Sequence, residues 1–362
     1  MYLDLADNST AMNFAEPVLT ALKASLVKAT QRLAVLPDQA AWQSLYDYAD
    51  SLDLTRPEIQ LKLHNGGGTS IYGVINVNGK LIGAIIPENS SASVSGETMA
   101  FTLARALGIG RIYQAGVSHF LSEKNLDVFM QIVPSPTIYN PKTGEPLKNK
   151  NENRIAILQR YHDHPEGMDA VFKRWDEKPK DFAVIDGVGA SINKSQVLTG
   201  SQAALASLVQ CDGPRPDLNT RVTFMGGSNT EDEVARELSG ILLIDALTGQ
   251  YDRFSGGNLQ VITQQVEGVS VSTLASIDNG GTWEGSLKTN LSMVSRFERS
   301  VADQIKAMDD FFTKGIPNLG LHNEAEFKSA FDVVQVSKKF DQFKSNLNAT
   351  ANHIRAHEGC YF

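Results

Sequence analysis

Residues 242–262 read LLIDALTGQYDRFSGGNLQVI, and residues 273–281 read TLASIDNGG. The glycine-rich polar segments of the two stretches include the carboxylates Asp252 and Asp278 and the amide Asn258. Carboxylate and amide oxygens are the ligands that a hard cation such as Mg²⁺ prefers. If the two segments meet in the folded chain, they supply a metal site with a further carboxylate beside it.

Regular structure is predicted on both sides of these loops. Thr230 and Glu233 form a capping-box pattern, and the apolar helix that they open ends at Gly249. Two short strands, Leu259–Ile262 and Val269–Ile277, then flank a turn and lead to the second polar segment. The order is therefore helix, polar loop, hairpin and second polar loop.

This order resembles the catalytic and metal loops of the protein-kinase-like superfamily. The likeness is greatest to its atypical branches: the HipA-type kinases, the phosphatidylinositol kinases, the secretory-pathway casein kinases and the actin-fragmin kinase. The resemblance implies that Asp252 is the catalytic acid/base with Arg253 as its neighbour, and that Asn258 and Asp278 bind metal. It also implies ATP and Mg2+ (or Mn2+) as cofactors, because phosphoryl transfer depends on an acid near the acceptor and on metal at the phosphates.

The N-terminal half agrees with the resemblance in the order of its elements. Alternating apolar residues predict three strands, a two-residue turn at Asn78-Gly79 predicts a hairpin, and a helix follows. The predicted elements are Ile59–Leu63, Ile71–Val77, Lys80–Pro87 and a helix from Glu97 that stops at Gly108.

A glycine-rich turn between the first two strands is the candidate phosphate cover. Its residues are Gly66, Gly67, Gly68, Thr69 and Ser70. Backbone N–H groups of such a turn can approach phosphate oxygens closely. By the resemblance, Glu97 corresponds to the helix glutamate that pairs with a phosphate-binding lysine.

The predicted fold class is α+β: a two-lobed, protein-kinase-like fold with a small antiparallel-sheet N-lobe and a mostly helical C-lobe. Three domains are expected: an N-terminal helical extension at 1–55, the N-lobe at 56–135 and the C-lobe at 136–362. Residues 115–225 carry weaker patterns. There we expect a strand at Val128–Val133, helical pieces at Ile155–Tyr161 and Met168–Trp175, a strand at Phe182–Ile185 and a helix at Gln202–Val209.

Two features depart from the family pattern. The third strand should carry a lysine, but the expected position holds Ile86. Lys62 or Lys80 could reach the phosphates instead, and Lys62 is preferred because a neighbouring strand can present an ammonium to the same volume. The catalytic loop is also longer: five residues separate Asp252 from Asn258, where the ordinary kinase loop has four.

The expected function is an ATP- and metal-dependent phosphotransferase acting on a protein or small-molecule hydroxyl. Ile86 keeps open a nucleotide-binding pseudokinase, and rearranged phosphate contacts keep open a kinase-fold AMP transferase. Each motif alone also has a structural explanation: a flexible loop, a helix end, a hairpin turn, or a first-turn carboxylate at Glu97. An unrelated α+β fold remains a further alternative.

Composition narrows the partners. The formal charge of −8 argues against a protein that neutralises nucleic-acid phosphates, and no apolar run is long enough to span a bilayer. Cys211 and Cys360 are the only cysteines, so a disulfide framework is not expected and a reducing, cytoplasmic location is.

Overall fold

The computed structural model describes part of the 362-residue chain. The described residues are 47–64, 69–89, 93–114, 116–174, 182–184, 201–219, 230–254, 258–266, 269–281, 287–315 and 339–362. Most of the predicted N-terminal extension, and the predicted phosphate-turn residues Gly66, Gly67 and Gly68, lie outside them.

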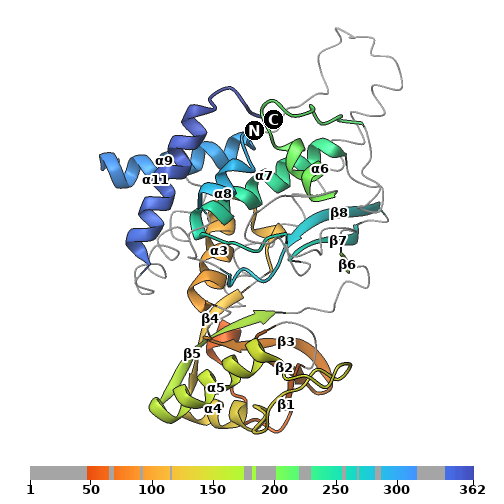
Figure 1. Ribbon diagram of the computed structural model, residues 1–362, viewed down its shortest axis with the longest axis vertical. Coiled ribbons are helices and arrows are strands. Elements are labelled where there is room, and N and C mark those ends of the chain that lie inside the picture. The colour runs from red at the N-terminus through yellow and green to blue at the C-terminus, as the bar shows by residue number, and fades with distance from the viewer. Residues whose placement is uncertain are drawn as a thin grey trace, which may run out of the picture. The chain divides into compact units, whose positions relative to one another are not determined.

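A five-stranded antiparallel sheet forms the N-lobe (Figure 1). Its strands are β1 (Ile59–Leu63), β2 (Gly73–Val77), β3 (Lys80–Pro87), β4 (Gly116–Ser122) and β5 (Gly167–Arg174), in the order β1-β2-β3-β5-β4. The hairpin between β2 and β3 turns at Asn78 and Gly79, whose φ angles are 51° and 79°, as a two-residue turn with two left-handed residues requires. The first and third strands have the predicted bounds.

Helix α3 (Val94–Ala106) connects β3 to β4 and is buried over almost its whole length. It begins one turn before Glu97, because the side chain of Ser93 accepts a hydrogen bond from the N–H of Gly96 and caps the helix. The helix ends where predicted, since Gly108 follows with φ +76°. A short 3₁₀ helix, η1 (Gly110–Ile112), leads on to β4.

Two helices, α4 (Glu123–Met130) and α5 (Lys148–Asp163), stand between β4 and β5 in the chain and contact those strands. The predicted strand at Val128–Val133 is wrong, because this segment is the last turn of α4 and the turns after it. The predicted helical piece at Met168–Trp175 is also wrong. Its described part is β5, whose run of buried residues on both faces is typical of a central strand.

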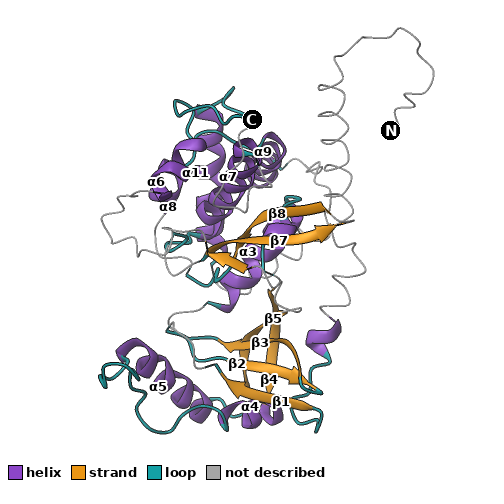
Figure 2. Ribbon diagram, turned by 90° about the vertical axis from the view of Figure 1, so that its right-hand side faces the viewer, coloured by secondary structure: helices purple, strands orange, loops and turns teal. Residues whose placement is uncertain are grey.

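The C-lobe is mostly helical and includes a small three-stranded sheet (Figure 2). Its helices are α6 (Ser201–Leu208), α7 (Glu231–Thr248), α8 (Leu287–Ser292), α9 (Arg299–Lys314) and α11 (Phe340–Ala356), and its strands are β6 (Phe182–Val184), β7 (Leu259–Val266) and β8 (Val269–Ser276). The predicted capping box is present: Thr230 and Glu233 bond reciprocally, and α7 ends at Gly249 in the left-handed conformation. This buried helix ends just before the first polar loop, which carries Asp252.

These elements confirm the predicted α+β fold with an antiparallel-sheet lobe and a helical lobe. The sheet of the N-lobe continues to Arg174, past residue 135, where the N-lobe was expected to end. Among the described helices, none has the length and apolar character needed to cross a bilayer.

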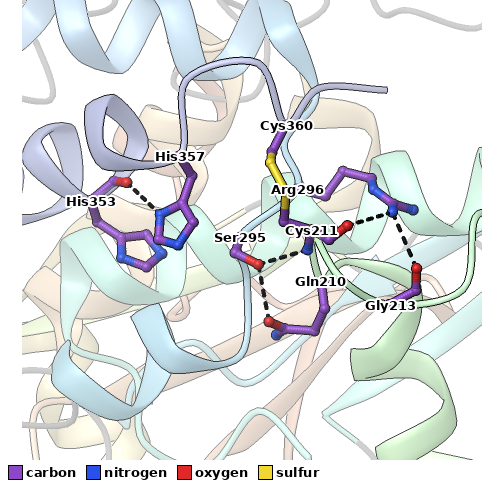
Figure 3. Close-up of a disulfide and its surroundings, with 8 residues drawn as sticks. All are labelled: Gln210, Cys211, Gly213, Ser295, Arg296, His353, His357 and Cys360. Atoms are coloured by element: carbon purple, nitrogen blue, oxygen red, sulfur yellow. Dashed lines mark hydrogen bonds between the residues drawn. A yellow bond between two sulfur atoms is a disulfide. The ribbon is translucent and has the colours of Figure 1, made fainter.

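A disulfide joins Cys211 to Cys360 across 149 positions (Figure 3). Two cysteines in a long chain did not lead us to expect a disulfide, but the fold brings the segment after α6 against the C-terminal segment. Hydrogen bonds fix both ends of this link. The N–H of Cys211 donates to Ser295 Oγ at 2.8 Å, and the N–H of Phe297 donates to the carbonyl of Cys360 at 2.9 Å.

Candidate active site

The two polar loops predicted from the sequence are bonded to each other. The N–H of Tyr251 donates to the carbonyl of Gly281 at 3.0 Å, and Gln250 Nε2 donates to the carbonyl of Asp278 at 2.9 Å. A Cβ added at Gly281 would lie 2.7 Å from Asp252 Oδ1. Glycine is thus required there for the loop of Asp278 to approach the carboxylate of Asp252.

Arg253 joins the two loops to each other and to α7 by hydrogen bonds. All five of its N–H groups donate to internal acceptors. Nε and Nη2 bind the two carboxylate oxygens of Asp245 on α7 at 2.9 and 2.8 Å. The other three N–H groups donate to the carbonyls of Asn258 and Ile277 and to Oδ1 of Asn279, at 2.7 to 3.0 Å. The side chain is 2% exposed, so Arg253 is part of the framework and has no N–H left for a substrate.

Asp252 is a carboxyl group in an unfavourable position for a negative charge. Burial and the neighbouring charge of Asp278 together raise its pKa to about 7, and Arg253 opposes the rise only in part. An acid whose pKa lies near neutrality is suited to general acid–base work. The repulsion from Asp278 is of the kind that a bound cation relieves.

Asn258 and Asp278 fit the predicted metal-binding roles. Asp278 is exposed and holds a left-handed backbone with φ 52°, a conformation that costs energy and is concentrated at functional sites. Asn258 donates Nδ2 to the carbonyl of Asp252 at 3.2 Å, which leaves its Oδ1 as the atom able to face a metal. Among the described residues, no group of three His, Cys, Asp or Glu side chains is placed to hold a metal ion. The expected donors are instead the carboxylate of Asp278 and the amide of Asn258, and both supply oxygen ligands that suit Mg²⁺ or Mn²⁺.

Glu97 has a buried cation as its partner, and that cation is Lys173 on β5. Lys173 lies opposite Ala84 in the sheet, and Val171 lies opposite Ile86, so Lys173 emerges on the same face as Ile86 from the next strand. Lys62 and Lys80, the predicted substitutes, are both exposed on their strands. The lysine that pairs with Glu97 therefore comes from β5, and phosphate binding by Lys62 or Lys80 stays a prediction.

Tyr72, which follows the glycine-rich turn, lies near Asp278. Tyr72 packs on a small apolar cluster that includes Ile86 and Val171. Burial and the charge of Asp278 raise the pKa of Tyr72 to about 12, so the phenol lies within electrostatic reach of that carboxylate. On the other side of the turn, Asn153 of α5 donates Nδ2 to the carbonyl of Thr69 at 3.0 Å.

Comparison with known proteins gives a fold but no sequence relative. No protein-family model matches the chain, and no curated protein sequence matches it. A solved structure of the Golgi casein kinase is similar at 12% identity, with a TM-score of 0.53 over 89% of this chain and 76% of that one. The structure of the Golgi casein kinase with Mn and ADP bound is similar at 13% identity, with a TM-score of 0.54 over 89% and 77%. At these identities the likeness shows the fold alone, and that fold is the atypical kinase-like one which the residue pattern predicts.

Proposed function

We propose that this protein is an ATP- and divalent-metal-dependent phosphotransferase that acts on a hydroxyl group of a protein or a small molecule. The observation that carries the proposal is the meeting of a buried Lys173–Glu97 pair with the loops of Asp252 and Asp278. The charge of Asp278 acts on both Glu97 and Asp252, so the three carboxylates share one region. Such a set of a lysine, a pairing glutamate, an acid/base and metal ligands is what phosphoryl transfer needs.

Each residue has a separate role in this proposal. Lys173 holds non-bridging phosphate oxygens of ATP, and Glu97 fixes the direction of its ammonium. Asn258 and Asp278 hold the metal, which when bound neutralises charge on the phosphates. Asp252 accepts the proton of the acceptor hydroxyl as that oxygen bonds to the γ-phosphorus and ADP leaves. Arg253 and Gly281 keep the loops in place.

The nature of the metal follows from the donor set only as far as an oxygen-preferring divalent cation. The Golgi casein kinase, which has this fold, has been solved with Mn and ADP bound. We propose ATP with Mg²⁺ or Mn²⁺ for this chain, and titration of each metal against activity distinguishes the two.

The test is transfer of the γ-phosphate from labelled ATP to the protein itself and to panels of acceptor proteins and small molecules. Asp252→Asn and Asp278→Asn should each reduce transfer by at least about a hundredfold. Asp341→Asn is the matched control, since Asp341 on α11 is 95% exposed and should change nothing. Equal transfer by all three variants would refute the assignment.

The two alternatives at this site are separable. The pseudokinase alternative rests on Ile86, and Lys173 now supplies the cation whose absence motivated it. AMP transfer differs in the mass that is added to the acceptor, so intact-mass spectrometry of the product distinguishes it from phosphate transfer.

The cytoplasmic location stays a prediction, and one observation favours the opposite. The Cys211–Cys360 disulfide is of the kind that persists in oxidising compartments. Mass spectrometry of the protein after alkylation without reduction tests this: two alkyl groups would support the cytoplasmic location, and none would support an oxidising compartment.

A further inference from the structure

Asn279 follows Asp278 directly and is 1% exposed. It contacts groups from both lobes. Its Oδ1 accepts two hydrogen bonds, from Arg253 Nη2 at 2.7 Å and from Ser276 Oγ at 2.6 Å. Its backbone amide lies close to the carboxylate of Glu97 and lowers the pKa of that group. One residue therefore lies between the pair Lys173–Glu97 and the framework arginine of the catalytic loop.

The segment around Asn279 is docked on the start of α3 by a second bond. The N–H of Ser93, the cap of α3, donates to the carbonyl of Gly280 at 3.1 Å. On the other side, Gln250 holds the carbonyl of Asp278. Residues 278–280 are thus held by hydrogen bonds from Ser93 on one side and from Gln250 on the other. They lie in a series of polar groups that runs from Lys173 through Glu97, Asn279 and Arg253 to Asp245.

We infer that Asn279 is a positioning residue that couples the lysine–glutamate pair of the N-lobe to the catalytic and metal loops of the C-lobe. This inference rests on the proposed function and names the residue that positions the lysine–glutamate pair relative to the two loops. The coupling is polar: in a dry interior a buried donor must find its acceptor, so a chain of satisfied bonds allows few alternative arrangements.

The side chain of Asn279 offers a clean substitution. Among the described residues its Nδ2 has no hydrogen-bond partner, so leucine, which has a similar shape, removes only the two accepted bonds. Asn279→Leu leaves a donor of Arg253 and the hydroxyl of Ser276 without that acceptor. Ser276→Ala is the matched control, because it deletes one bond to the same oxygen and leaves the bond from Arg253 in place.

The first experiment is amide hydrogen exchange on the full, ligand-free chain. In Asn279→Leu, exchange should rise by about tenfold or more in two separate places, the first turn of α3 and residues 250–254, with α9 unchanged. In Ser276→Ala the rise should stay below about threefold. A rise confined to residues 276–281, or an equal rise everywhere including α9, would overturn the coupling. Should the leucine variant fail to fold, Asn279→Ala, which leaves room for a water at the acceptor site, is held to the same two-place pattern.

The second experiment measures the coupling directly through binding of ADP with Mn²⁺. Lys173→Met should weaken binding by about tenfold or more in the wild-type background, but by less than about threefold in the Asn279→Leu background. If the loss of affinity in the double variant equals the product of the losses in the two single variants, the inference is contradicted. If the wild-type protein binds no ADP at all, the proposed function fails, and the exchange pattern still decides the role of Asn279.

Discussion

Two buried ion pairs, one in each lobe, differ in how completely their cations are used. All five N–H groups of Arg253 donate to protein acceptors, including both oxygens of Asp245. Lys173 has three N–H groups. Among the described residues, one hydrogen bond from Lys173 is present, and Glu97 accepts it. Both cations are almost fully buried.

We propose from this difference that the Arg253–Asp245 pair is structural and that the Lys173–Glu97 pair binds a ligand. A guanidinium whose fork is filled holds loops together and cannot also hold a ligand. An ammonium that still has N–H groups able to donate keeps a desolvated positive charge available. An anionic ligand can then accept hydrogen bonds from it without displacing a protein acceptor. We therefore expect loss of Arg253 to be felt mainly in stability and loss of Lys173 mainly in nucleotide binding.

Arg253→Leu should have the largest effect on stability. It leaves Asp245 buried without its partner and releases two backbone carbonyls, and breaking a buried pair from one side costs about 3 to 5 kcal/mol. Denaturant unfolding measures this. Arg253→Lys, which keeps the charge but has fewer donors, should fall between wild type and leucine. A leucine variant within about 1 kcal/mol of wild type would break the comparison.

Lys173→Met should cost less stability, about 1 to 3 kcal/mol, because it removes one hydrogen bond where Arg253→Leu removes five. Burial already raises the pKa of Glu97 and Lys173 opposes that rise, so removing the lysine favours the protonated carboxyl. Affinity for ADP with Mn²⁺, measured by calorimetry, should nevertheless fall by about tenfold or more. Lys173→Arg keeps the charge and should bind better than methionine. Unchanged affinity in Lys173→Met would remove the lysine from the site.

The pH dependence of stability tests whether Arg253, which is already paired with Asp245, also stabilises the ionised form of Asp252. The folded pKa of Asp252 is about 7, above its ordinary 3.8, so its contribution to stability is present at low pH and is lost as pH rises through about 7. The slope is at most about 1.4 kcal/mol per pH unit. Asp252→Asn lacks this slope and should gain on wild type between about pH 5 and 7. A constant difference would mean that Arg253 already neutralises Asp252.

The sequence predicted the loops of the C-lobe because their signals are local. The capping box at Thr230, the glycine end at Gly249 and the hairpin that leads to Asp278 all lie within a few residues of the groups that they position. The hydrogen bonds of Arg253 and Asn279 could not be predicted, since burial of a charged group depends on packing from several elements.

Lys173 was missed because its signal is not local. Its strand reads GMDAVFKR, in which the only apolar run is Ala170–Phe172. A run this short shows no clear period and cannot be told from a buried helical segment. Its partner Glu97 is 76 positions away, and the helices α4 and α5 separate the two in the chain. The pairing of Cys211 with Cys360 is a similar case, because spacing in a sequence contains no information on which distant segments meet.

Lys62→Met and Lys80→Met should have the smallest effects. Both side chains are exposed on β1 and β3, and exposed substitutions usually change stability by less than about 0.5 kcal/mol. Since Lys173 already faces Glu97, neither change should shift the affinity for ADP with Mn²⁺ by more than about twofold. Calorimetry on the two single variants and on their combination with Lys173→Met checks this. A tenfold loss in Lys62→Met would mean that β1 supplies a phosphate ligand after all, and the comparison of the two ion pairs would then have to include a third cation.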